Sequence, residues 1–174
     1  MKRLQQVLIL LCVSIMLTGC IGNPYKTGIK SLEDGEYSKA VESFTEAIDE
    51  EKNLADSYRG LGIALWELQD PQGALDAMES ALEHGTKENA TIYSIMGNCA
   101  MQIKGFEQAA EYYEAALSME DISEELKKET MYNLIAAYEY AGDIEKAREA
   151  LEEYIADYPD DESVLREAEF LETR

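Results

Sequence analysis

The stretch GFEQAAEYYEAAL, Gly105–Leu117, decides the fold because the chain contains three more stretches built on the same plan. Each begins with a turn, continues to an alanine and places a large apolar residue four positions later. The other three are GEYSKAVESFTEAI at Gly35–Ile48, DPQGALDAMESAL at Asp70–Leu82 and GDIEKAREALEEYI at Gly142–Ile155. The alanine and apolar pairs are Ala40/Phe44, Ala74/Met78, Ala109/Tyr113 and Ala147/Leu151. Successive alanines are 34, 35 and 38 residues apart, and self-similarity at such a period indicates a repeat architecture.

A second pattern precedes three of the four stretches. It reads Tyr58-x2-Leu61-Gly62-x2-Leu65, Tyr93-x2-Met96-Gly97-x2-Ala100 and Met131-x2-Leu134-Ile135-x2-Tyr138. Apolar residues recur at the helical spacing of three and four, and Gly or Asp-Pro interrupts them at regular intervals. We therefore expect pairs of antiparallel helices that approach closely at Gly62 and Gly97, with Phe44 or Tyr113 filling the neighbouring space.

Together the two patterns resemble the tetratricopeptide repeat (TPR), whose signature is W-x2-L-G-x2-Y…A-x3-F…P. The resemblance extends from Asn23 to about Asp160. It implies an all-α, right-handed α-solenoid of about four helix pairs, closed by a helix with one polar face that keeps the end of the stack soluble. The expected domain is 24–174, with repeats at about 24–53, 54–88, 89–122 and 123–160 and a C-terminal capping helix at 161–173.

Local signals predict where some of these helices begin and end. Asp70-Pro71 is typical of a helix start, and His84-Gly85 is typical of a helix end. The first repeat keeps only Gly28 of its first-helix signature, and Ile135 replaces the usual glycine in the fourth. The segment 118–128 is about four residues longer than the repeat period requires, so we expect either a wider turn or an extra helical turn there.

The N-terminus carries a different signal. Lys2 and Arg3 precede an apolar run over 7–17, about 11 residues long and within the range of a signal-peptide core. A membrane-spanning helix needs about 20 apolar residues. An ordinary secretory signal cleaved near Gly19, or a truncated transmembrane helix, would also produce such a run.

The run ends at Leu17-Thr18-Gly19-Cys20, which resembles the lipobox of bacterial lipoproteins. The resemblance implies that residues 1–19 are a signal peptide and that Cys20 carries a covalent diacylglyceryl lipid. Residues 20–23 would then be a short tether. The protein is expected on the extracytoplasmic face of a bacterial membrane, which is the outer membrane if the host has one.

The formal net charge of −21 limits the partners of this chain. Nucleic-acid binding draws on Lys and Arg to neutralise phosphates, so nucleic acid is not an expected partner. Anionic lipid head groups would also repel the acidic surface, so contact with the membrane is expected through the lipid anchor only. Once Cys12 leaves with the signal peptide and Cys20 is lipidated, Cys99 has no partner for an internal disulfide.

The search for catalytic chemistry is largely negative. His84 is the single histidine, so a histidine-based triad or zinc site has no second member. Cys99 aligns with Ala64 and Ala137 of neighbouring repeats, which predicts a packed thiol in preference to a nucleophile. The sequence therefore predicts a protein that is not an enzyme and that has no cofactor or metal beyond the lipid.

Binding is the remaining activity, and the resemblance implies a concave groove lined by the first helix of each pair. The groove residues are then expected to be Arg59, Ile63, Trp66, Asn98, Met101, Tyr132, Asn133 and Tyr140. Trp66 could instead pack between repeats. Glu33, Glu67 and Gln102 occupy positions at which relatives that bind a C-terminal carboxylate carry cationic residues. This favours a partner with basic or apolar character.

Two functions fit these patterns. The first is a membrane-anchored scaffold of the cell envelope that binds a peptide or helix of a protein partner in its groove. The alternative is an accessory lipoprotein whose acidic surface captures cationic peptides, wall polymers or metal ions.

Overall fold

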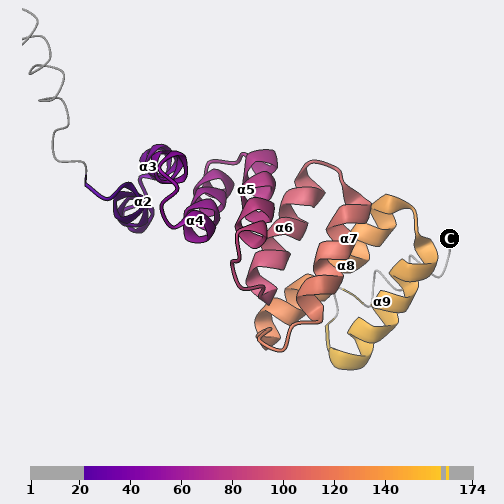
Figure 1. Ribbon diagram of the computed structural model, residues 1–174. Helices are drawn as coiled ribbons and strands as arrows, with labels where there is room; N and C mark the ends of the chain where they lie inside the picture. Colours follow the sequence, from indigo (N-terminus) through magenta and orange to yellow (C-terminus); the bar gives the residue numbers. More distant parts are fainter. Residues whose placement is uncertain (1–21, 162–163, 165–174) are drawn as a thin grey trace, which may run out of the picture.

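In the computed structural model of the protein, the described residues are 22–161 and 164, and they form eight α-helices joined by short turns (Figure 1). The helices are α2 (Pro24–Glu33), α3 (Tyr37–Asp49), α4 (Leu54–Glu67), α5 (Pro71–Glu83), α6 (Ala90–Gln102), α7 (Phe106–Leu117), α8 (Glu124–Ala141) and α9 (Ile144–Asp157). Within these residues there is no β-strand. The predicted signal peptide lies outside the described residues, as does the predicted capping helix apart from Asp161 and Val164.

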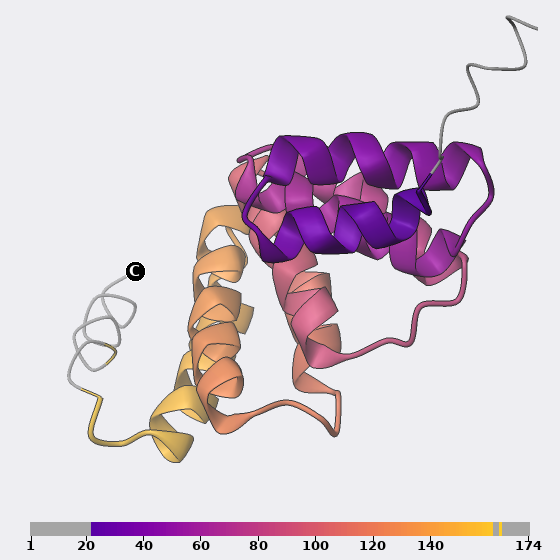
Figure 2. The same ribbon diagram turned by 90° about the vertical axis from the view of Figure 1, so that its left-hand side faces the viewer.

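Every helix packs against the next one along the chain, and the chain forms four successive pairs: α2/α3, α4/α5, α6/α7 and α8/α9. Contacts also join first helices of neighbouring pairs, α2 to α4 and α6 to α8. The helices of the first pair run across the view in Figure 2, whereas those of the last pair run nearly at right angles to them. The helix axes therefore turn progressively along the stack. The all-α solenoid expected from the repeats is confirmed.

Helix ends follow from local hydrogen bonding. Asp70 Oδ1 accepts a hydrogen bond from the Gly73 amide at 3.0 Å, and Pro71 occupies the first turn of α5. At the other end of α5, Nδ1 of His84 lies 2.8 Å from the Ser80 carbonyl oxygen. Gly85 follows with φ of +94°, a conformation that glycine adopts without steric cost. Both predicted boundaries of α5 are confirmed.

Glycines allow the helices to approach closely, as predicted for Gly62 and Gly97, but Gly62 lies against Met78 and Phe44 lies against other glycines. A Cβ atom on Gly97 would lie 2.4 Å from the ring of Tyr113, and one on Gly60 would lie 2.4 Å from the ring of Phe44. The Phe44 ring also lies against Gly28, so it fills the space between α2 and α4. Each ring therefore connects a second helix to the backbone of a first helix.

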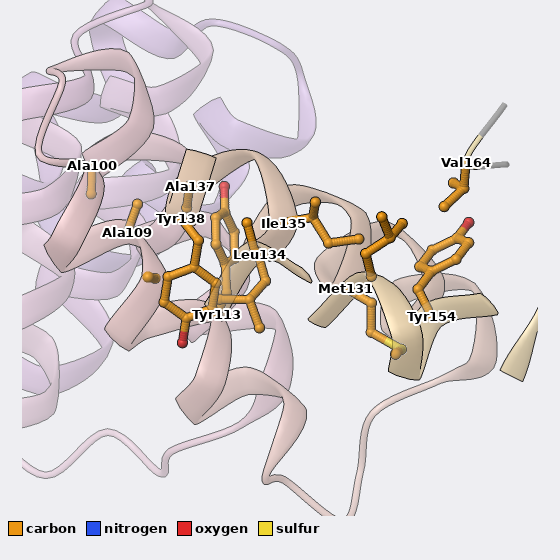
Figure 3. Packing of buried hydrophobic residues seen from close by; sticks show 13 residues of the cluster. Ala100, Ala109, Tyr113, Met131, Leu134, Ile135, Ala137, Tyr138, Tyr154 and Val164 are labelled. Carbon is orange, nitrogen blue, oxygen red and sulfur yellow. The ribbon is translucent and has the colours of Figure 1, made fainter. Parts of the chain in front are cut away.

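The core is a series of three clusters along the stack. The first lies among α2, α3 and α4 around Phe44, and the second lies around Met78 and Met96. The third and largest extends from Ala100 in α6 to Val164, with Val164 beside Tyr154 at its end (Figure 3). Buried apolar area stabilises such a fold by about 25 cal/mol per Å², and here neighbouring pairs share that contribution.

Of the two alternatives predicted for the long segment between α7 and α8, the structure shows the extra helical turn. Helix α8 has 18 residues and begins at Glu124, seven residues before Met131, whereas α6 begins three residues before the equivalent Tyr93. The Ser123 side chain accepts a hydrogen bond from the Leu126 amide and caps this turn. In the preceding loop, Asp121 Oδ1 accepts a hydrogen bond from the Ala90 amide at the start of α6. The longer segment therefore contacts the starts of both α6 and α8, the first helices of the third and fourth pairs.

Candidate functional site

We call the surface formed by α2, α4, α6 and α8 the inner face, and the surface formed by α3, α5, α7 and α9 the outer face. The predicted groove residues lie on three of the inner helices. Arg59, Ile63 and Trp66 are on α4, Asn98 and Met101 are on α6, and Tyr132, Asn133 and Tyr140 are on α8. The inner helices touch at two places, between α2 and α4 and between α6 and α8.

Two predicted groove residues meet directly. The Asn133 amide group donates a hydrogen bond to Oδ1 of Asn98 at 3.2 Å. The same Asn98 oxygen accepts a hydrogen bond from the Tyr113 hydroxyl at 2.6 Å. The amide nitrogen of Asn98 and the amide oxygen of Asn133 lie outside these two bonds. An amide pair of this kind can offer both a donor and an acceptor to a peptide backbone.

Two tyrosines of α8 expose their rings. Tyr132 is 46% exposed and Tyr140 is 68% exposed. Tyr132 makes an edge contact with Tyr154, with ring centroids 6.5 Å apart, and Tyr140 stacks on Phe106 at 5.1 Å. A hollow of about 400 Å³ lies beside Tyr132, and its other lining residues are Glu125, Lys128, Glu129 and Tyr154. An exposed ring held by a second ring presents apolar area in one orientation, which suits an anchor for a partner.

The remaining predicted groove residues are less available. Trp66 and Ile63 are partly buried and pack against the second core cluster, and Met101 packs against the third. The arginine Arg59 is paired with Asp56 of the same helix at 2.9 Å. Of the two alternatives for Trp66, packing against a neighbouring repeat therefore accounts for part of its surface, while the rest stays accessible.

Reactive groups are scarce in the described part of the chain. Cys99 is fully buried, and burial raises the pKa of its thiol from 9.0 to about 11, so the thiol stays protonated at neutral pH. Residues 22–161 contain no group of three or more His, Cys, Asp or Glu side chains that could hold a metal ion. Among the same residues, no helix combines the length and the hydropathy needed to cross a bilayer.

The outer face carries a feature that the sequence analysis missed. Two contiguous hollows of about 250 and 340 Å³ lie between α7 and α9, and both are lined by Glu114, Tyr138 and Lys146. The Tyr138 hydroxyl donates a hydrogen bond to Glu114, and Nζ of Lys146 lies 5.1 Å from the centre of the Tyr138 ring. Burial, followed by the hydrogen bond to Glu114, raises the pKa of Tyr138. We call the two hollows together the outer cavity.

A sequence signal for the outer cavity exists in the repeat alignment. Tyr112 of α7 and Ala150 of α9 occupy equivalent positions, three residues after the repeat alanines Ala109 and Ala147. The first and second repeats carry Ser43 and Ala77 at this position, so Tyr112 is the large residue among the four and Ala150 follows it with a small one. The change is visible in the sequence, but its consequence depends on how the helices pack.

Comparison with known proteins agrees with this architecture. Three family models, each described as tetratricopeptide repeat, match residues 25–90, 90–121 and 129–161. The TPR repeat-containing protein YsoA of Bacillus subtilis (strain 168) is 28% identical over 142 residues. The match covers 82% of this chain but only 42% of the length of YsoA.

Similar solved structures include two MamA proteins and YrrB. A MamA crystal structure has a TM-score of 0.70 at 19% identity and covers 85% of this chain and 78% of that one. MamA from Desulfovibrio magneticus RS-1 has a TM-score of 0.68 at 22% identity, with 89% and 87% covered. YrrB, described as a TPR protein with an unusual peptide-binding site, has a TM-score of 0.67 at 23% identity, with 84% and 73% covered. These likenesses concern the fold. Since the family models match 25–121 and 129–161, the chain belongs to the tetratricopeptide repeat family.

Proposed function

We propose that this protein is a lipid-anchored, non-enzymatic scaffold that binds a peptide or helix of a protein partner on its inner face. The observation that carries the proposal is the arrangement on α6 and α8. The Asn98–Asn133 amide pair connects these two helices, and the exposed rings of Tyr132 and Tyr140 lie on α8 beside it. The description of YrrB as a protein with a peptide-binding site supports peptide binding as the kind of interaction.

The proposal also includes the location of the protein at the membrane. The lipobox-like segment Leu17–Cys20 supports diacylglyceryl transfer to Cys20, cleavage before it, and retention on the extracytoplasmic face of a bacterial membrane. Stable anchoring takes more than one acyl chain, which a diacylglyceryl group provides. The envelope process that this scaffold serves depends on the identity of its partner.

The proposal is tested by crosslinking in intact cells followed by purification of the tagged protein. The Tyr132→Ala/Tyr140→Ala variant removes two exposed rings, so a groove partner should disappear from the crosslinked set while the helical circular dichroism spectrum stays unchanged. Leu68→Ala is the matched control, because Leu68 is an exposed apolar residue at 43% outside the predicted groove. Identical partner sets from all three proteins would contradict binding on the inner face.

A Trp66→Ala/Tyr132→Ala variant extends the test to α4. Because Trp66 packs partly against the core, thermal unfolding must be measured beside binding, and a lost partner counts only if the fold persists. Separately, Cys20→Ser should release the protein from the membrane fraction and abolish labelling by a fatty-acid probe. Unchanged fractionation and labelling would contradict the anchor without affecting the groove proposal.

An alternative function, capture of cationic ligands by the acidic surface, differs in its dependence on salt. Exposed charges are screened over about 10 Å at 0.1 M salt. Binding to the general acidic surface should therefore weaken steeply as salt rises, whereas contacts with tyrosine rings and amide groups should persist.

A further inference from the structure

The outer cavity lies on the opposite side of the last two repeats from the predicted groove. Its base is formed by residues of α8, including Leu134 and Tyr138, and its walls are formed by α7 and α9. Asn133, the neighbour of Leu134, instead contacts α6 on the inner face. Helix α8 thus separates two surfaces, and an occupant of one does not compete directly with an occupant of the other.

One position in the lining of the outer cavity carries an alanine, Ala150, where the preceding repeat carries Tyr112. Between α5 and α7, the Tyr112 hydroxyl donates a 2.5 Å hydrogen bond to Glu79, and Gln108 donates to the Tyr112 oxygen at 3.0 Å. In the next repeat the equivalents of Gln108 and Tyr112 are Lys146 and Ala150. Ala150 lines the 340 Å³ hollow, so α9 contributes no ring at this position. The ring that binds the equivalent glutamate, Glu114, comes instead from Tyr138 of α8, and a hollow remains beside it.

The charged residues that line the outer cavity are mainly acidic. Its acidic members are Glu107, Glu111, Glu114, Asp143, Glu149 and Glu153. Lys146 is the basic residue among the described lining residues. The glutamates among them are exposed to solvent, whereas Ala110 and Leu134 beneath them are buried. A long side chain with an apolar stem and a positive end matches both parts of this surface.

The contact between Lys146 and Tyr138 shows how a cation is held here. The ammonium nitrogen lies 5.1 Å from the ring centre, within the distance of a cation–π interaction, and the hydroxyl of the same ring is bound to Glu114. An arginine would bind such a site better than a second lysine, because its planar guanidinium can stack on a ring and donate to a carboxylate at the same time. Lys146 is exposed and can swing aside.

We propose that the outer cavity is a second binding site, which receives an arginine side chain from a basic segment of a partner protein. The guanidinium lies over the Tyr138 ring and pairs with Glu114 and Glu149, and the aliphatic stem lies in the space left by Ala150. The site is independent of the inner face, so the protein can hold two segments of one partner or two partners at once.

The test uses the full-length protein in nonionic detergent and a capped octapeptide of alternating arginine and alanine, with binding measured by calorimetry at about 0.1 M salt. Ala150→Tyr introduces the ring that Tyr112 supplies in the preceding repeat, without changing the charge. It should weaken binding about tenfold or more, which corresponds to about 1.4 kcal/mol. Ala150→Ser, which keeps the cavity open, should bind as the unmodified protein does. Equal affinity of both variants would overturn the proposal.

A matched pair of charge variants separates the site from general attraction to an acidic protein. Glu114→Gln/Glu149→Gln and Glu42→Gln/Glu46→Gln remove the same charge, the second pair from exposed positions on α3. Only the first should weaken binding of the arginine peptide. Equal weakening by both would show non-specific attraction and would overturn the proposal, provided that both variants unfold at similar temperatures.

The inner-face variant Tyr132→Ala/Tyr140→Ala distinguishes this site from the proposed groove. It should leave the affinity for the arginine peptide unchanged. A loss of affinity in this variant, with none in Ala150→Tyr, would place the peptide on the inner face and would overturn the second site while leaving the groove proposal intact.

Discussion

Tyr113 connects the core to the inner face at the scale of single residues. Its ring lies against the Gly97 backbone, and its hydroxyl donates to Asn98, which in turn accepts from Asn133. Tyr113 is 1% exposed, so the hydroxyl reaches the inner face from within the protein. A hydrogen bond of this kind contributes about 1 kcal/mol, and it also fixes the orientation of the Asn98 amide. The buried Tyr113 thus orients the amide of Asn98, a candidate binding residue.

The close contact at Gly97 yields a stability prediction. Gly97→Ala gains about 1 kcal/mol of helix propensity, but its Cβ would lie 2.4 Å from the Tyr113 ring. Overpacking in a core destabilises by about 1–3 kcal/mol. We expect the free energy of unfolding to fall by about 1–2 kcal/mol in urea titrations.

Gly105→Ala is the control for that substitution, because the nearest atom to its Cβ is 3.5 Å away. Its effect should stay below about 1 kcal/mol, the scale of a changed helix cap. If Gly97→Ala proved as stable as Gly105→Ala, the ring contact would not limit the packing of α6 against α7.

The buried thiol predicts a loss of stability at high pH. The pKa of Cys99 is raised from 9.0 to about 11 by burial, so the unfolded chain releases this proton at a lower pH than the folded protein. The stabilisation that the buried, protonated thiol of Cys99 contributes is complete below pH 9 and is lost as the pH rises through 11. The free energy of unfolding should therefore decrease over this range.

Cys99→Ala isolates that contribution, since alanines occupy the equivalent buried positions 64 and 137. The variant should show a flatter dependence of unfolding free energy on pH between 9 and 11. Loss of stability between pH 10 and 12 should remain, because burial also raises the pKa of Tyr154 from 10.0 to about 12. An unchanged slope in Cys99→Ala would assign the effect to other groups.

At the scale of helices, side-chain caps mark the start of most helices and packing sets their positions. Five N-caps accept a hydrogen bond through their own side chains: Asn23, Asp70, Asn89, Ser123 and Asp143. Four amides at the start of any helix lack partners within it, so these side chains stabilise the first turns. The helices are between 10 and 18 residues long, and isolated helices of this length are marginal in water.

The cap of α5 gives a prediction for one element. Asp70→Ala removes the acceptor for the Gly73 amide, 3.0 Å away, and should lower the free energy of unfolding by about 1 kcal/mol. Asp76→Ala is the control on the same helix, because Asp76 is exposed and its carboxylate accepts a hydrogen bond from the exposed Gln72 side chain and caps no helix. Equal unfolding midpoints for the two variants in urea would contradict a stabilising cap.

At the scale of the whole molecule, charge opposes compactness. The chain has 36 acidic and 15 basic residues, and ion pairs such as Lys39–Glu36 and Lys128–Asp161 have partly exposed side chains, from 17% to 58%. Exposed pairs each contribute about 0–1 kcal/mol. We expect self-repulsion of the excess negative charge to outweigh them, while shared apolar clusters hold neighbouring repeats together.

This balance predicts that salt stabilises the protein. Raising sodium chloride from about 0.01 M to about 1 M shortens the Debye length from about 30 Å to about 3 Å. Each 1 kcal/mol of relieved repulsion should raise Tm by about 2–4 °C in a chain of this size. A Tm that falls with salt, in thermal unfolding followed by circular dichroism, would show that ion pairs dominate.

The sequence by itself determined the repeat period, the helix pairs, the small residue beneath Tyr113, and the boundaries of α5. These signals are local, because periodicity, capping and steric size act within one helix or between neighbours. It also brought Asn98 and Asn133 into one candidate site, although their contact was not foreseen. Lipidation at Cys20 and binding at the groove residues remain predictions.

The tertiary structure alone decided which predicted residues are available and where space remains. The exposure of Tyr132 and Tyr140, the partial burial of Trp66 and the outer cavity each depend on side chains from different helices that the fold brings together. Ala150 illustrates the reason. An alanine in a helix pattern has no particular meaning until the packing of α7, α8 and α9 shows that no ring fills the space beside it, because a cavity is a property of several helices together.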